Sequence, residues 1–386
     1  MFSKTIERLN RPASMRIASL AKKLKAGGHD ILDLTLGQPD LPVHYNIIES
    51  VHECLLSGKT GYTESQGILE LREQISVYES EKWGYPISAD QVLVSPGGKQ
   101  AIYYALRTLV NPLDEVIIIE PCWLSYKELI EMVGGKAVIL NTDPNKNFVV
   151  SIHEILAKIT SKTKAIILNV PNNPTGSIYP SDTIKMLIRY SAAHQIFLIF
   201  DNIYDEIIFD DEKIEYSLEP LQCEKLIIVN GFSKSFSMTG FRVGYVISHE
   251  IIMEQMIKVH EQLATCTSIV SQYAALAALR IEKSYLEKRK EVFERRRDFV
   301  VNRCRELNID LIVPQGGIYC LIDTRSINSS SVVAAEKILQ HALVAVIPGV
   351  VYGISSEGYV RISLVGDEAI LEEALKRISD LMELTL

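Results

Sequence analysis

Polar and aromatic side chains that could do chemistry follow five short apolar runs of the sequence. In chain order they are a glycine turn before a helical segment at Gly97-Gly98-Lys99, an indole at Trp123, a carboxamide at Asn173, a carboxylate with a phenol at Asp201 and Tyr204, and a hydroxyl with an amine at Ser233 and Lys234. Each has an ordinary structural explanation, because glycines make tight turns, aspartates cap helices and lysines are mostly solvated. Their place at the ends of successive runs favours one shared binding site.

One cofactor, pyridoxal phosphate (PLP), needs all of these groups at once. Its phosphate needs backbone N–H groups at a helix N-terminus, which the glycine turn would provide. Its ring needs an aromatic face, and a buried carboxylate keeps its ring nitrogen protonated. Its phenolic oxygen accepts hydrogen bonds, and its aldehyde forms a Schiff base with a lysine amine. The five groups therefore predict a PLP site in which Lys234 carries the cofactor and no metal takes part.

The segments between these groups predict a sheet that brings them together. Short, continuously apolar runs alternate with amphipathic segments, which is typical of βαβ units and of a mostly parallel sheet covered on both faces. Ligands bind at the carboxyl ends of such strands, so the five groups should lie at one edge of the sheet. The predicted strands are 91–95, 115–119, 137–140, 165–170, 197–200, 225–229 and 245–248, and the predicted helices are 100–109, 125–132, 151–158 and 181–194.

The pattern changes after about residue 280, which predicts a second domain. Residues 281–304 form a long, charge-rich helical segment with apolar positions on one face, as expected of a solvated helix that links two domains; a coiled coil or a basic surface helix is the alternative. Strands at 309–313, 317–322, 344–347 and 360–363, with helices at 331–340 and 367–382, indicate a smaller α+β domain. We therefore expect an N-terminal arm that joins the small domain (1–45), a large domain (46–285) and a C-terminal small domain (286–386).

Composition and charge exclude several other classes of protein. The 386 residues carry a net charge of −8, which disfavours a nucleic-acid partner, and no apolar run approaches the roughly 20 residues of a membrane span. The six cysteines stand singly, which predicts free thiols and a reducing compartment such as the cytoplasm. The sequence has no GxGxxG dinucleotide motif, no P-loop and no HExxH metal motif.

The chain resembles the class I, fold type I PLP-dependent aminotransferases, in the branch of bacterial aspartate and broad-specificity enzymes. Segment 231–245 (GFSKSFSMTGFRVGY) carries the likeness most specifically, together with 172–176 (NNPTG) and 201–204 (DNIY), and the match runs from 36–40 to 360–363. The resemblance implies an α/β fold with a large domain around a mostly parallel, seven-stranded sheet and a smaller α+β domain. It also implies a ping-pong reaction in which an L-amino acid, such as aspartate or an aromatic one, gives its amino group to a 2-oxo acid such as 2-oxoglutarate.

The resemblance assigns a role to each candidate residue. Lys234 forms the Schiff base and then moves protons, Asp201 pairs with the ring nitrogen, and Trp123 stacks on the ring. Tyr204 and Asn173 bind the phenolic oxygen. The phosphate ligands are Gly98, Lys99, Ser233 and Arg242, with Tyr62 from the neighbouring subunit, and the substrate ligands are Arg361 for the α-carboxylate, Asn173, Gly37, Trp123 and Lys99. Because Tyr62 acts across an interface, the resemblance implies a homodimer with shared active sites.

Some positions depart from the family pattern and leave the substrate open. Asn202 replaces an acid that does not pair with the ring nitrogen, and Tyr352 stands where the family more often has a phenylalanine. Ile318 replaces the commoner Ala/Ser-Phe pattern before Tyr319. Lys99 resembles the lysine with which aspartate-accepting relatives meet a distal carboxylate. Segment 11–16, with Met15 and Arg16, lies where relatives read the substrate side chain, so the sequence leaves open whether Lys99 or Arg16 reads such a group.

Other functions remain as alternatives to transamination. The same fold and cofactor serve β-lyases, decarboxylases and aminocyclopropane-type synthases, because a fold does not fix the reaction. A transcription regulator with an aminotransferase-like domain would need a DNA-binding module, for which we see no basic recognition element. A nicotinamide dehydrogenase would need the glycine fingerprint that the sequence lacks.

Overall fold

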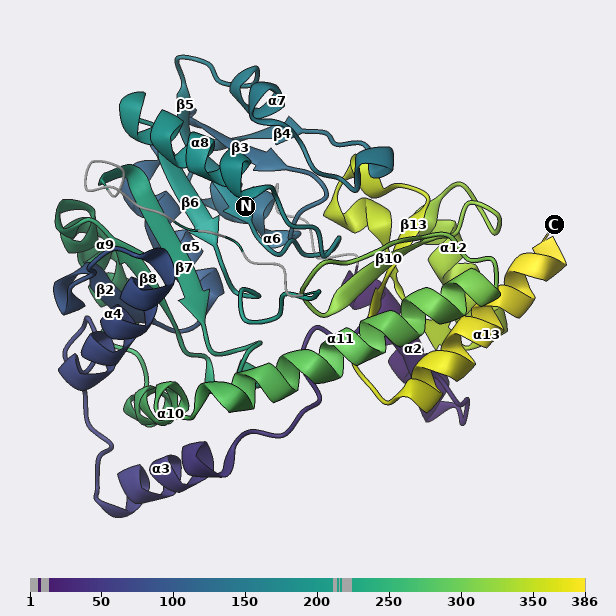
Figure 1. The fold of residues 1–386 in the computed structure, drawn as a ribbon, viewed down its shortest axis with the longest axis horizontal. Helices are drawn as coiled ribbons and strands as arrows, with labels where there is room; N and C mark the ends of the chain where they lie inside the picture. The colour runs from purple at the N-terminus through teal and green to yellow at the C-terminus, as the bar shows by residue number, and fades with distance from the viewer. Residues whose placement is uncertain (1–5, 8–13, 211–213, 215, 217–223, 386) are drawn as a thin grey trace.

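The protein folds into two lobes that are joined along one long helix (Figure 1). The computed structural model describes residues 6–7, 14–210, 214, 216 and 224–385. The larger lobe surrounds a seven-stranded sheet, and the smaller lobe gathers the C-terminal strands and helices with the N-terminal helix α2 (Ser14–Ala26). Within the described residues, no helix is both long enough and apolar enough to cross a membrane.

The seven predicted strands of the large lobe form one sheet in the order β2-β8-β7-β6-β5-β3-β4. β8 runs antiparallel to both β2 and β7, and every other pair is parallel. The predicted α/β fold with a mostly parallel, seven-stranded sheet is therefore confirmed. The strands are β2 (Val92–Ser95), β3 (Glu115–Ile119), β4 (Lys136–Leu140), β5 (Thr163–Asn169), β6 (Phe197–Asp201), β7 (Leu226–Gly231) and β8 (Gly244–Ser248).

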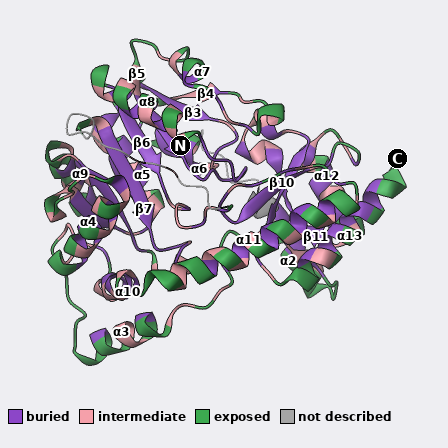
Figure 2. Ribbon diagram, in the orientation of Figure 1, coloured by how far each residue is buried: buried purple, intermediate pink, exposed green. Residues whose placement is uncertain are grey.

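Helices cover both faces of this sheet, because successive strand residues point to opposite sides. Val92 and Val94 of β2 belong to one apolar cluster, and Leu93 between them belongs to the other. Figure 2 shows the strands buried and the outer faces of the helices exposed. The first cluster packs against α4 (Leu69–Trp83), α7 (Ile152–Leu156), α8 (Ser181–Ala193) and α10 (Ile269–Leu279), and the second against α5 (Gly98–Leu109), α6 (Ser125–Met132) and α9 (Glu250–Ala264).

Within the part of the chain that the structure describes, the small lobe contains two short sheets and four α-helices. One sheet is antiparallel, in the order β12-β13-β10-β9, and the other pairs β1 with β11 in parallel. The arm therefore contributes a strand to this lobe. The elements are β1 (Leu32–Asp33), β9 (Leu311–Ile312), β10 (Tyr319–Asp323), β11 (Val344–Ala345), β12 (Ile347–Pro348), β13 (Tyr359–Ser363), α2, α11 (Lys283–Glu306), α12 (Ser331–Lys337) and α13 (Glu368–Thr385).

The structure differs from the predicted fold at one strand of the small lobe and adds several helices to the large lobe. The single strand expected over 344–347 is wrong, because its first part pairs with β1 and its last part with β13, so the run divides between two sheets. Among the helices not predicted are α3 (Tyr45–Leu56), α4, α9 and α10. The boundaries at 45/46 and 285/286 stay predictions; the second falls within α11, which runs along both lobes (Figure 1).

Candidate active site

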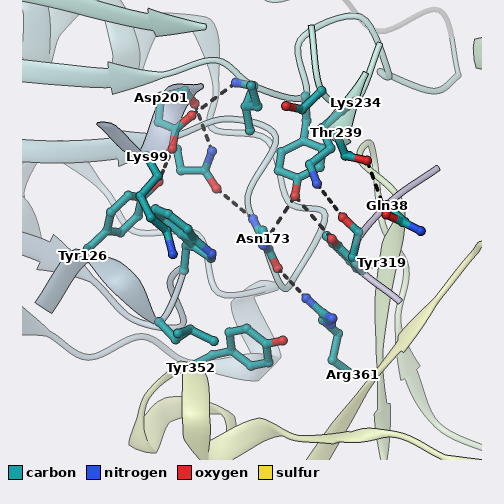
Figure 3. A pocket seen from close by; sticks show the side chains of 18 of the residues that line it. Gln38, Lys99, Tyr126, Asn173, Asp201, Lys234, Thr239, Tyr319, Tyr352 and Arg361 are labelled. Atoms are coloured by element: carbon teal, nitrogen blue, oxygen red, sulfur yellow. Dashed lines mark hydrogen bonds between the residues drawn. The ribbon is translucent and has the colours of Figure 1, made fainter. Parts of the chain in front are cut away.

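A cavity of about 660 Å³ opens where the two lobes meet, at the carboxyl ends of the parallel strands. Its wall combines residues of the large lobe with residues of the arm and the small lobe (Figure 3). The structure brings eleven of the twelve predicted site residues to this wall, and Tyr62 is the exception. The eleven are Gly37, Gly98, Lys99, Trp123, Asn173, Asp201, Tyr204, Ser233, Lys234, Arg242 and Arg361.

Asp201 is the last residue of β6 and brings a buried carboxylate to the cavity. The Tyr126 hydroxyl donates to Oδ2 at 2.5 Å, and the Ile203 backbone N–H donates to Oδ1 at 3.2 Å. Burial raises the pKa of Asp201 to about 6, although these two hydrogen bonds oppose the shift. An ionised carboxylate buried here destabilises the fold when it has no cationic partner, so the site is suited to a ligand that brings a positive charge.

Three side chains beside Asp201 form a hydrogen-bonded series that ends at a cation. Arg361 donates from Nη1 to Asn173 Oδ1 at 3.2 Å, and Asn173 Nδ2 lies 3.4 Å from the Tyr204 hydroxyl. Arg361 Nη2 donates to the Thr35 carbonyl of the arm at 3.0 Å, and its Cζ lies 3.9 Å from the centroid of the Tyr319 ring. Burial raises the pKa of Tyr204 well above its ordinary value, so its hydroxyl keeps its proton.

The N-terminus of α5 faces the cavity beside an arginine. The helix begins at Gly98, and its N-cap Gly97 has a φ of 86°, a conformation that glycine adopts readily. A Cβ on Gly97 would lie 2.5 Å from Arg242 Nη2, so a side chain at this position would displace the guanidinium. Arg242 Nη1 donates to the Thr239 carbonyl at 2.9 Å, which fixes the side chain. Helix-terminal N–H groups beside a guanidinium form a site for an anion such as a phosphate.

Two lysines project into the same cavity from different strand ends. The Lys234 amine donates to the Gly37 carbonyl and lies 5.8 Å from the centroid of the Tyr204 ring. The Lys99 amine lies 4.9 Å from the centroid of the Trp123 indole. Burial lowers the pKa of Lys99, and the nearby charge of Arg242 lowers it further.

Several residues that the sequence did not predict as site residues also line this wall. Tyr126 lies on α6 three residues after Trp123 and was hidden in an ordinary amphipathic pattern, whereas Tyr319 and Tyr352 come from the small lobe. Thr35 belongs to the arm, and its contact with Arg361 is made through a backbone carbonyl that no side-chain pattern reveals. Of the arm segment 11–16, positions 11–13 lie outside the described residues, and α2 begins at Ser14.

The donor set of the cavity fits PLP. A buried carboxylate is suited to a protonated ring nitrogen, the helix N-terminus with Arg242 to a phosphate, and Lys234 to an aldehyde. Trp123 supplies an aromatic face on the same wall. Together with the mostly parallel sheet and the small lobe, these groups define a PLP-dependent enzyme of fold type I.

Comparison with known proteins gives the family. A family model described as aminotransferase class I and II matches residues 29–378. The aspartate aminotransferase of Thermotoga maritima is 35% identical over 99% of each chain, and aromatic-amino-acid aminotransferase 2 of Thermococcus litoralis is 33% identical over 99% of this chain and 98% of its own. The structure of the Thermus thermophilus aspartate aminotransferase with maleate matches with a TM-score of 0.94, at 32% identity over 99% of each chain. The chain therefore belongs to the class I and II aminotransferases, and it is an enzyme that transfers amino groups with PLP as its cofactor.

The raised pKa of Asp201 predicts a pH-dependent gain in stability for Asp201→Asn in the PLP-free protein. The pKa is 3.8 in an exposed carboxyl and about 6 in the fold. The folded state therefore binds more protons between these values, and stability falls as pH rises through them. Above pH 6 we expect Asp201→Asn to unfold with a free energy up to about 3 kcal/mol higher than wild type, and at pH 4 we expect little difference.

Urea titrations from pH 4 to pH 8 measure this gain. Asp380→Asn is the matched control, because Asp380 is exposed on α13 and its loss should leave stability unchanged at every pH. A stability difference between wild type and Asp201→Asn that stays constant from pH 4 to pH 8 would contradict the prediction.

Proposed function

We propose that the protein moves an amino group from an L-amino acid, aspartate or an aromatic one, to a 2-oxo acid such as 2-oxoglutarate by a ping-pong mechanism. The observation that carries the proposal is the pairing of a buried arginine, Arg361, with a lysine, Lys234, in one cavity that also holds Asp201. The names of the relatives, which include aspartate and aromatic-amino-acid aminotransferases, support these substrates.

The residues at the cofactor end of the cavity have distinct proposed tasks. When bound, PLP supplies an electrophilic carbonyl and an electron-withdrawing ring that allow an amino group to leave one substrate and pass to another. Asp201 holds a positive charge opposite its carboxylate, and Tyr204 and Asn173 donate hydrogen bonds to an anionic oxygen. Lys234 holds the cofactor and carries a proton at Nζ between substrate atoms. Trp123 packs on the ring.

A second set of proposed ligands fixes the phosphate. The proposed ligands are the N–H groups of Gly98 and Lys99, the Ser233 hydroxyl and the Arg242 guanidinium, and all four residues line the cavity. Helix N-termini and arginine both favour phosphate binding, and arginine adds two parallel donors. Trp123 and Lys234 line the same cavity and would hold the rest of the cofactor.

Arg361 is the proposed ligand of the substrate α-carboxylate. Its guanidinium is held by Asn173 and by the Thr35 carbonyl, so it is oriented before a substrate arrives. Such preorganisation lowers the entropy lost on binding and places the reacting carbon near Lys234. The backbone at Gly37 lies beside this position, because its carbonyl accepts from the Lys234 amine.

We also propose a homodimer with shared active sites. Tyr62, the predicted phosphate ligand, is 88% exposed and lies outside the cavity of its own chain. Large apolar side chains are exposed on the nearby α3, at Tyr45, Ile48, Leu55 and Leu56. Helix α3 packs against α10 at the outer edge of the large lobe (Figure 1), and its outward apolar side chains suit a surface that a second copy covers. The cytoplasmic location expected from the unpaired cysteines stays a prediction.

The reaction type can be tested with one amino acid and no acceptor. Wild-type enzyme loaded with PLP should release one equivalent of 2-oxo acid per site and lose the visible absorbance of the lysine-bound cofactor. Lys234→Ala should still bind PLP but lack that absorbance, with a rate lower by about a thousandfold or more. Lys158→Ala, which removes an exposed lysine, should behave as wild type. Release of ammonia and pyruvate would indicate a β-lyase instead.

Lys99 is proposed to assist substrates with a distal carboxylate. Its amine faces the cavity beside Trp123, where a second carboxylate could reach it. Lys99→Ala should lower kcat/KM for aspartate about tenfold more than for phenylalanine, because only aspartate loses an ionic partner. Steady-state kinetics with both donors measure the ratio, and an unchanged ratio would assign the distal contact elsewhere.

The homodimer predicts a solution mass of about twice the 43.3 kDa of one chain, which light scattering after gel filtration measures. Leu56→Glu, on the exposed face of α3, should shift the protein toward the monomer and weaken PLP retention about tenfold or more, because a charge would be buried without a partner. Leu384→Glu places the same charge on the exposed end of α13 and should change neither property. A monomer that retains PLP fully would refute shared sites.

A further inference from the structure

A buried hydroxyl on the cavity wall has no task in the function proposed above. Tyr352 ends the short helix η6 (Gly349–Tyr352) of the small lobe and lines the cavity. Its side chain is 2% exposed, and its hydroxyl has no hydrogen-bond partner among the described residues. Buried hydroxyl groups in folded proteins are nearly always paired, because an unpaired one destabilises the fold. A bound molecule is therefore the natural source of the missing partner.

The ring that carries this hydroxyl lies beside the proposed carboxylate ligand. Figure 3 shows the hydroxyl turned toward the side of the cavity on which Arg361 lies, and the centroid of the Tyr352 ring is 5.2 Å from Arg361 Cζ. Arg361 Nε also has no partner among the described residues. A guanidinium only donates hydrogen bonds, so a molecule that satisfies both groups must bring acceptor atoms, and a carboxylate brings two.

The protonation state of Tyr352 suits this task. Burial raises the pKa of Tyr352, and the positive charge of Arg361 offsets only part of the increase. The hydroxyl therefore keeps its proton at neutral pH and can donate. Its backbone is also fixed against the large lobe, because the Tyr352 carbonyl accepts from the Cys122 N–H at 2.9 Å. Trp123, which follows Cys122 in the chain, lines the same cavity.

We propose that Tyr352 is a substrate-binding residue whose hydroxyl donates to the α-carboxylate held by Arg361. The inference rests on the proposed function, because it takes the role of Arg361 from there. The amino donor and the oxo acceptor both carry this carboxylate next to the reacting carbon. Tyr352 therefore strengthens the binding of every substrate alike and does not distinguish their side chains.

The experiment compares PLP-loaded wild type with Tyr352→Phe, which removes only the hydroxyl. Calorimetry measures the affinity for two unreactive probes, the dicarboxylate maleate and the monocarboxylate 3-phenylpropionate. Both dissociation constants should rise about tenfold in the variant, the loss expected for a hydrogen bond to a charged group. KM for donor and acceptor should rise by the same factor, with kcat changed less than about twofold. Tyr359→Phe removes a hydroxyl from the strand that carries Arg361, outside the cavity, and should change neither affinity nor KM.

Each other result would overturn the inference. Weaker binding of maleate alone would assign the hydroxyl to a distal carboxylate, and equal affinities in variant and wild type would leave it without a substrate role. A melting temperature of the substrate-free variant at or above that of wild type is also expected, because an unpaired hydroxyl is lost; a clear decrease would indicate a structural role. Failure of wild type to bind either probe, or to transaminate, would instead reject the proposed function on which the inference rests.

Discussion

The burial of one carboxylate, that of Asp201, is the constraint on which the rest of the site depends. β6 lies inside the sheet, between β5 and β7, and its last side chain is buried at the bottom of that sheet edge, with 5% of its surface exposed. The pKa of about 6 shows that the surroundings compensate this charge poorly in the protein alone. A sheet whose strands are mostly apolar can tolerate such a group, and the group is useful only to a ligand that brings a positive charge.

A second polar layer fixes the segments that carry Asp201 and Lys234 relative to each other. Asn230, at the end of β7, donates from Nδ2 to Glu79 Oε1 at 3.1 Å and to Asp205 Oδ2 at 2.9 Å. Asp205 follows Asp201 by four residues, and Asn230 precedes Lys234 by four, so both loops are held by one amide. Lys82 of α4 binds Asp205 Oδ2 at 2.7 Å and so fastens this layer to a helix. Such a network is strong only when nearly all members are paired, and it restricts how far either loop can move.

The sequence predicted the seven strands of the large lobe and the polar residues at the strand ends that line the cavity, for a physical reason. Short buried strands with polar side chains at their ends are local patterns, and the parallel sheet brings those ends together whatever the helices do. The other end of the cavity could not be found in this way. Thr35 contributes a backbone carbonyl, Tyr126 sits in an unremarkable helix, and Tyr352 becomes a cavity residue only because two lobes meet. The prediction of one strand over 344–347 was wrong for a related reason. Its first half pairs with β1, more than three hundred residues earlier in the chain, and its second half pairs with the nearby β13.

The division between the lobes has a consequence for how substrate choice can vary. The proposed cofactor ligands belong almost entirely to the large lobe, where strand register and buried polar contacts fix them. Arg361, Tyr319 and Tyr352 reach the cavity from the small lobe, and Gly37 reaches it from the arm that pairs with that lobe. A change in the small lobe or the arm therefore alters what surrounds the substrate while the geometry of Asp201 and Lys234 stays the same. This separation of tasks allows substrate choice to change while the cofactor site stays the same, because pocket shape and cofactor chemistry are set by different parts of the chain.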